Sequence, residues 1–116
     1  MRLSVTGRHI EITGSMKQYA EDKARKLTKF YDRIEMIEVV IDRESVRYRV
    51  EMVVRTDHRH TFVGQVDAGE FYEAIDLVVD KLERQLKKHK EKHRNRKHLA
   101  KPGPKMAEED ETDGVG

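Results

Sequence analysis

Hydrophobic residues recur with two different periods in the first third of the chain. At the start, Leu3 and Val5 alternate with polar residues, which is the pattern of a half-buried strand. After Thr13, a residue type suited to cap a helix, apolar residues recur at helical spacing instead. That stripe consists of Met16, Ala20, Ala24, Leu27 and Tyr31. We therefore predict a strand over 2–8 and a helix over about 14–31.

The middle of the chain returns to a period of two. The residues predicted to face inward are Ile37, Val39 and Ile41 in one run, Tyr48, Val50, Met52 and Val54 in the next, and Phe62, Gly64 and Val66 in the last. Polar clusters at 42–45 and 57–59 separate the runs. Gaps this short favour antiparallel hairpins, so we expect three further strands.

The longest periodic element lies in the last third of the chain. Its apolar stripe consists of Phe71, Ile75, Val78, Leu82 and Leu86. Asp67, followed three residues later by Glu70, resembles a capping box at the helix start. No Gly or Pro interrupts the pattern before Lys97, which predicts a helix over about 70–97. Because the stripe ends at Leu86, the last turns are expected to project from the domain with no core beneath them.

The order β-α-β-β-β-α predicts an α+β fold, with a four-stranded, mainly antiparallel sheet and both helices packed on one face. This arrangement is similar to double-stranded RNA-binding domains. The domain is predicted to span 1–97. Residues 98–116 contain two prolines and an acidic end, and we expect them to form a disordered tail. The other sheet face, which carries Arg47, Arg49 and Arg55, is expected to face solvent.

Charge is distributed unevenly, although the net charge is only +2. Residues 1–80 contain 13 basic and 15 acidic side chains, residues 81–105 contain 11 and 2, and residues 106–116 contain five acidic and no basic ones. Interaction with the helix dipole would account for two or three cations near a C-terminus, but not for the whole basic segment. Cations along a helix can follow a phosphate backbone and release its counterions. The segment therefore favours salt-sensitive binding to a polyanion.

Composition argues against several other classes. The absence of Cys excludes a disulfide scaffold, a thiolate nucleophile and a Cys-based metal site. No apolar run is long enough for a membrane span or a signal peptide, so we expect a cytoplasmic protein that contacts no membrane. Neither a nucleophile elbow nor a glycine-rich phosphate loop is present. We therefore assign no catalytic residue, no cofactor and no small-molecule substrate.

The six histidines suggest two further sites. Asp57, His58 and His60 could form a metal site, but they lie in a predicted hairpin turn and no further ligand clearly converges on them, so we assign no metal. His89 and His93 could share a helix face. Among so many cations, we interpret them as donors that face RNA.

The first predicted helix adds a second group of cations. Arg25, Lys26 and Lys29 lie on its exposed side, with Lys23 nearby. If both helices pack on one sheet face, the two basic rows are expected to border a common groove. Such a groove fits a wide, folded RNA better than a base-reading helix would, and nothing resembles a helix-turn-helix or a zinc finger.

The sequence resembles the bacterial ribosome hibernation factors, which include the hibernation-promoting factor and the ribosome-associated translation inhibitor. The resemblance covers about residues 1–94. It rests on Leu3-Ser-Val-Thr-Gly7 with Ile10-Glu-Ile-Thr13, on Lys26-Leu27 with Phe30-Tyr-Asp-Arg-Ile34, and above all on Glu70-Phe-Tyr-Glu-Ala-Ile-Asp76, Asp80-Lys-Leu-Glu-Arg-Gln-Leu86 and Lys88-His-Lys90.

The resemblance implies a protein that binds the small ribosomal subunit between head and body. It would contact rRNA along the mRNA channel, compete with mRNA and tRNA, block translation and stabilise inactive ribosomes in stationary phase or stress. The sequence is similar to the short members of the family, and we expect a monomer off the ribosome. Whether it promotes or opposes ribosome dimerisation is left open.

Resemblance and charge together assign the RNA contacts to ten cations. These are Lys23, Arg25, Lys26, Lys29, Lys81, Arg84, Lys87, Lys88, Lys90 and Lys92. Tyr72 matches the family motif, but it is interpreted either as a contact or as a packing residue.

Two other functions are left open. The chain could be a free double-stranded RNA-binding module, although that fold is expected to place lysines where this second helix carries Glu70, Glu73 and Asp76. It could also modulate transcription through an alternative sigma factor, a label that such sequences have sometimes been given.

Overall fold

The computed structural model describes residues 1–57 and 59–95. Its elements are β1 (Arg2–Arg8), α1 (Gly14–Arg25), the short 3₁₀ helix η1 (Lys26–Lys29), β2 (Ile34–Glu44), β3 (Arg47–Thr56), β4 (Thr61–Ala68) and α2 (Phe71–Asn95). The predicted order β-α-β-β-β-α is therefore confirmed. The expected tail, 98–116, lies outside the described residues.

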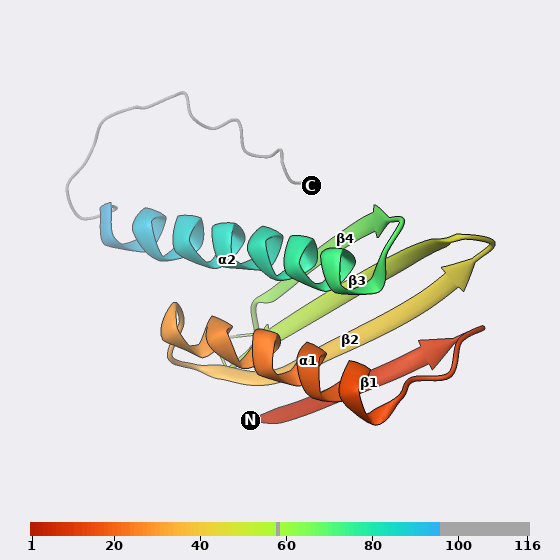
Figure 1. Cartoon of the computed structure of the whole chain (residues 1–116). Helices are drawn as coiled ribbons and strands as arrows, with labels where there is room; N and C mark the ends of the chain where they lie inside the picture. The colour runs from red at the N-terminus through yellow and green to blue at the C-terminus, as the bar shows by residue number, and fades with distance from the viewer. Residues whose placement is uncertain (58, 96–116) are drawn as a thin grey trace.

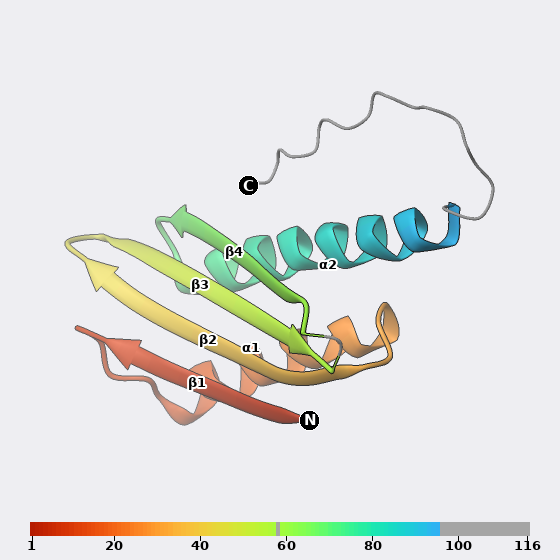
Figure 2. The ribbon, with the colours of Figure 1, turned by 180° about the vertical axis from the view of Figure 1, so that it is seen from behind.

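The four strands form one sheet in the order β1-β2-β3-β4. β2, β3 and β4 pair antiparallel, whereas β1 pairs parallel with β2, because α1 crosses over between them. Both helices cover the same face, with α1 over the β1 side and α2 over the β4 side (Figure 1). The opposite face is left uncovered (Figure 2), and Arg47, Arg49 and Arg55 are exposed there as predicted.

The core lies between the sheet and the helices. The predicted inward residues of β2, and those of β3 apart from Tyr48, are buried in the expected alternation. The whole predicted stripe of α2 is buried against them. Tyr48, Phe62 and Val66 pack against this core while remaining partly exposed. In the part of the chain that the structure describes, no helix is long and apolar enough to cross a membrane.

The first helix begins as predicted but ends earlier. The Thr13 hydroxyl accepts a hydrogen bond from the Met16 amide at 3.2 Å, which caps the N-terminus. At the other end, α1 stops at Arg25 and continues as η1 instead of remaining α-helical to Tyr31. The Thr28 hydroxyl donates to the Arg25 carbonyl at 2.8 Å, a local bond that competes with helix continuation. The last turn is consequently tightened, as is frequent at helix ends.

The predicted capping box at α2 is wrong. Asp67 lies in β4, opposite Arg49 of β3, and the two side chains pair at 3.5 Å. Glu70 caps the helix instead, because its carboxylate accepts the Glu73 amide hydrogen bond at 3.0 Å and its carbonyl accepts the first helical bond, from Ala74. The strand outcompetes the cap at Asp67, since the Asp67 backbone is still within the β3–β4 ladder.

One further residue of α2, His89, packs against the domain beyond Leu86. The His89 ring lies 4.5 Å from that of His60, 5.2 Å from that of Phe62 and 5.8 Å from that of Tyr31. The His89 ring therefore packs toward the start of β4. The helix continues to Asn95; residues 96–97 of the predicted helix and the His93 side chain lie outside the description.

Candidate nucleic-acid interface

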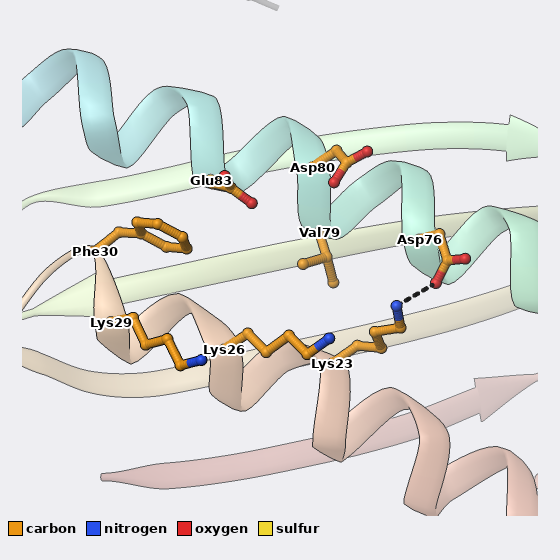
Figure 3. Close-up of a pocket in the computed structure, with 8 residues that line it drawn as sticks. All are labelled: Lys23, Lys26, Lys29, Phe30, Asp76, Val79, Asp80 and Glu83. Atoms are coloured by element: carbon orange, nitrogen blue, oxygen red, sulfur yellow. Dashed lines mark ion pairs between the residues drawn. The ribbon is translucent and has the colours of Figure 1, made fainter.

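A pocket of about 310 Å³ lies between α1–η1 and α2 on the helical side of the molecule (Figure 3). Lys23, Lys26 and Lys29 form one wall. The wall contributed by α2 carries Asp76, Asp80 and Glu83, and the apolar lining residues are Phe30 and Val79. The sequence led us to expect two basic rows that border a common groove. The pocket instead has a basic wall on α1–η1 and an acidic wall on α2.

Helical spacing explains the acidic wall. Asp76, Asp80 and Glu83 follow one another at intervals of three or four residues, and so share the side of α2 that faces α1. Lys81 lies on the other side, where its Nζ donates to the Gln65 carbonyl at 2.9 Å. Gln85 donates to the Val63 carbonyl at the same distance. Both side chains thereby cover the backbone of β4, an edge strand of the sheet.

Three side chains connect α1 to α2 at one end of the pocket. The Tyr19 hydroxyl donates to Oδ1 of Asp76 at 2.7 Å. The Lys23 ammonium lies 3.3 Å from the same oxygen, and Figure 3 shows this ion pair. The hydrogen bond to Asp76 raises the pKa of Tyr19 and also that of Lys23 above their usual values. We call these three residues the interhelical clamp. The Tyr72 ring packs edge-on against that of Tyr19 at 4.8 Å, while 39% of Tyr72 is exposed.

Several predicted RNA contacts already have partners within the protein. Lys23 belongs to the clamp, and Lys81 holds the β4 edge. Arg25 pairs with Asp22 at 3.5 Å and with Glu21 at 3.9 Å. Lys87 pairs with Glu83 at 3.0 Å, and its Nζ lies 4.9 Å from the centre of the Phe30 ring.

Other predicted contacts are available for a ligand. Within residues 1–57 and 59–95, the exposed side chains of Lys26, Lys29, Arg84 and Lys90 make no ion pair or hydrogen bond. We call them the unpaired cations. Lys88 is also exposed, and the Lys92 side chain lies outside the description. An anionic ligand that contacts the unpaired cations displaces no internal partner.

Sequence reasoning missed the clamp and the acidic wall. Asp76 and Tyr19 are 57 residues apart, and no local pattern connects them. The spacing of Asp76 and Asp80 places both on one helix face, but the sequence does not show that α1 lies opposite that face.

The structure offers no support for the metal alternative. Among the described residues, no group of three or more His, Cys, Asp or Glu side chains could hold a metal ion. Asp57 lies 3.4 Å from Arg33, and His60 packs against Phe62 and His89. His58 lies outside the described residues.

Comparison with known families identifies one that extends over nearly the whole described chain. A family model described as "Sigma 54 modulation protein / S30EA ribosomal protein" matches residues 3–94. This range includes every element of the fold except the first residue of β1 and the last residue of α2.

Individual relatives are similar over most of the chain. The ribosome hibernation promoting factor of Azotobacter vinelandii is 31% identical over 102 residues, which are 88% of this chain and 94% of the relative. The protein of the same name from Escherichia coli K12 is 35% identical over 96 residues, 79% of this chain and 96% of the relative.

Two solved structures are similar in fold. A ribosomal subunit interface protein from Coxiella burnetii has a TM-score of 0.73 and 25% identity, with 78% of this chain and 99% of that chain covered. The N-terminal domain of Protein Y from Thermus thermophilus has a TM-score of 0.70 and 31% identity, with 77% and 99% covered.

Proposed function

The chain belongs to the family of sigma 54 modulation proteins and S30EA ribosomal proteins, and on this basis we propose that it binds the small ribosomal subunit as a hibernation factor. The observation that carries the proposal is the match to ribosome hibernation promoting factors over 94% and 96% of their own lengths. These relatives are named for ribosome hibernation, a form of translation regulation and not an enzymatic activity.

The proposed mechanism is occupation of a site. The protein lies against rRNA in the mRNA channel of the small subunit, where it excludes mRNA and tRNA and thus keeps the ribosome inactive. No bond is made or broken. The affinity comes from contacts between cations and phosphates, which position a protein on RNA and make its binding salt-dependent.

The distribution of partners within the protein supports a particular contact surface. A cation held by a carboxylate or a carbonyl loses part of that interaction when it turns toward a phosphate, so its net gain in free energy is smaller. The unpaired cations pay no such cost. We therefore propose that Lys26, Lys29, Arg84 and Lys90 dominate the electrostatic contact, and that Lys88 and Lys92 extend it. Lys23, Arg25, Lys81 and Lys87 then contribute less.

Co-sedimentation with purified small subunits over a series of salt concentrations tests this proposal. Changing the four unpaired cations to Gln is expected to weaken binding strongly. It should also lower the slope of log K against log salt by roughly 0.7–0.9 per lost phosphate contact. Inhibition of translation in a purified system should be lost in parallel.

The control removes the same number of charges from the sheet. Arg2, Arg8, Arg47 and Arg55 changed to Gln should leave subunit binding and the salt slope nearly intact. Equal losses in both variants would mean that only net charge matters, and would contradict the assigned surface. Tight binding to naked duplex RNA without any preference for subunits would favour the RNA-binding module instead.

A further inference from the structure

The two walls of the interhelical pocket carry opposite charges, and only the Lys23–Asp76 pair joins them among the described residues. In the described part of the chain, Lys26 and Lys29 have no side-chain partner, and neither has Asp80 on the opposite wall. Glu83 is paired through Oε2, with Lys87. A ligand that fills the pocket must therefore offer an anionic group to α1–η1 and hydrogen-bond donors to α2.

A phosphate backbone alone does not meet this requirement. Its charges would be attracted to the lysines and repelled by Asp76, Asp80 and Glu83. A simple cation would be attracted to the acids of α2 and repelled by the lysines of α1–η1. A single nucleotide suits both walls, because its phosphate is anionic while its base carries N–H groups.

The acidic wall also discriminates among the bases. An ionised carboxylate only accepts hydrogen bonds, and its two oxygens can accept a parallel pair. Guanine presents two adjacent donors, N1–H and the N2 amino group, on one edge. Adenine and cytosine have one amino group beside an acceptor, and uracil has one N–H between two carbonyls. Asp80, which has no internal partner in the described residues, is the acceptor best placed for guanine.

The shape of the pocket admits one nucleotide rather than a duplex. A volume of about 310 Å³ lies at the small end of the range of roughly 300–1,000 Å³ typical of ligand sites. The half-buried Phe30 supplies apolar surface on which a base can pack, and the buried Val79 lies beneath the pocket. Proteins commonly read RNA in this way, by accepting an unpaired base from a loop or a bulge.

We propose that the pocket between α1–η1 and α2 binds one unpaired guanine nucleotide, with its phosphate on Lys26 and Lys29 and its base edge on Asp80 and Glu83. This inference rests on the proposed binding to rRNA and adds a base preference to it. The acids, which electrostatics alone would place away from RNA, thereby select the nucleotide.

Short single-stranded RNAs test the inference directly. Oligouridines with one central guanosine, inosine, adenosine or uridine are titrated at constant salt and followed by fluorescence anisotropy. The guanosine RNA should bind roughly tenfold more tightly than the adenosine and uridine RNAs. Inosine, which lacks the N2 amino group but keeps N1–H, should lie between them.

The variants separate base reading from phosphate binding. The double change Asp80→Asn, Glu83→Gln should abolish the guanosine preference without weakening binding to oligouridine. The double change Lys26→Gln, Lys29→Gln should weaken all four RNAs and retain the preference. Glu73→Gln, an exposed carboxylate of α2 outside the pocket, is the matched control and should change neither. Circular dichroism checks that each variant is folded.

Three results would overturn the inference: equal affinity of the wild-type protein for all four RNAs, no binding at low salt, or a preference that persists in the Asp80→Asn, Glu83→Gln variant. GMP as a competitor should displace the guanosine RNA in either case, so the two affinities distinguish the source of the ligand: tighter binding of the RNA indicates a residue within RNA, and tighter binding of GMP indicates a free nucleotide. If the wild-type protein binds subunits but shows no base preference, only this inference is contradicted. If the wild-type protein does not bind subunits, the proposed function is contradicted.

Discussion

Asp76 engages two side chains of α1, those of Tyr19 and Lys23. Its carboxylate accepts from Tyr19 and pairs with Lys23, so one side chain connects the two helices and neutralises a predicted RNA contact. Asp80, one turn further along α2, has no such partner in the described residues. Two acids of the same type therefore have different roles, which depend on what α1 places opposite each of them.

Changing Asp76 to Asn tests the clamp. The pKa of Tyr19 should fall toward its usual value, because the phenol loses an anionic acceptor that opposes its ionisation. The change should also lower the free energy of unfolding by about 1 kcal/mol, through the lost charged hydrogen bond. Absorbance titration of tyrosine and urea denaturation measure the two effects. Asp80→Asn is the control and should alter neither, and an unchanged Tyr19 pKa in Asp76→Asn would contradict the clamp.

The elements are positioned by close contact as much as by hydrophobic pattern. A Cβ atom added at Gly64 of β4 would lie 2.5 Å from Cδ2 of Leu82, which is completely buried in α2. Gly64 therefore lets the helix pack directly onto the strand. This approach also brings Lys81 and Gln85 within hydrogen-bonding distance of the β4 backbone.

Gly64→Ala is accordingly expected to destabilise the fold. Overpacking a filled core typically costs about 1–3 kcal/mol, because the buried Leu82 side chain must shift to admit the added methyl group. Thermal and urea denaturation give the measurement. Gly14→Ala at the start of α1 is the matched control, since nothing lies within 4 Å of the added methyl group. A Gly64→Ala variant as stable as Gly14→Ala would show that α2 does not depend on this contact.

The whole molecule exposes a sheet with two edges, and the β4 edge is partly covered by α2. Unpaired backbone groups on an edge strand can pair with another chain. Lys81 and Gln85 occupy the Gln65 and Val63 carbonyls, so these side chains oppose such pairing. We therefore expect Lys81, which the sequence assigns to RNA, to protect this edge from pairing with a second copy of the chain.

Replacing both Lys81 and Gln85 by Ala should increase self-association while leaving RNA affinity close to that of the wild type. Analytical ultracentrifugation over a range of concentrations measures the first effect, and anisotropy with an oligouridine measures the second. Arg84→Ala, on the same helix, is the contrasting variant: it should weaken RNA binding and leave self-association as in the wild type. A large loss of RNA affinity in the Lys81→Ala, Gln85→Ala variant would show that Lys81 contacts RNA, and would contradict its assignment to the β4 edge.

Local pattern was sufficient to predict the order of elements and the core of this protein. Alternation in β2 and β3 and the apolar stripe of α2 identify residues that are buried in the structure, because burial of one face imposes its period directly on the chain. The failures occur at boundaries. Asp67 stays in β4 and Thr28 tightens the end of α1, where strand pairing or a side-chain hydrogen bond competes with helix propensity.

The candidate site depended on tertiary structure to a much greater degree. Net charge by segment identified α2 as basic, but a sum of charges does not show which side of the helix each charged side chain occupies. Only the packing of α1 beside α2 decides that Asp80 and Glu83 face Lys26 and Lys29, that Asp76 neutralises Lys23, and that Lys81 points to β4. These relations join residues distant in sequence, and Coulombic and hydrogen-bond energies depend on distance in space and not on position along the chain.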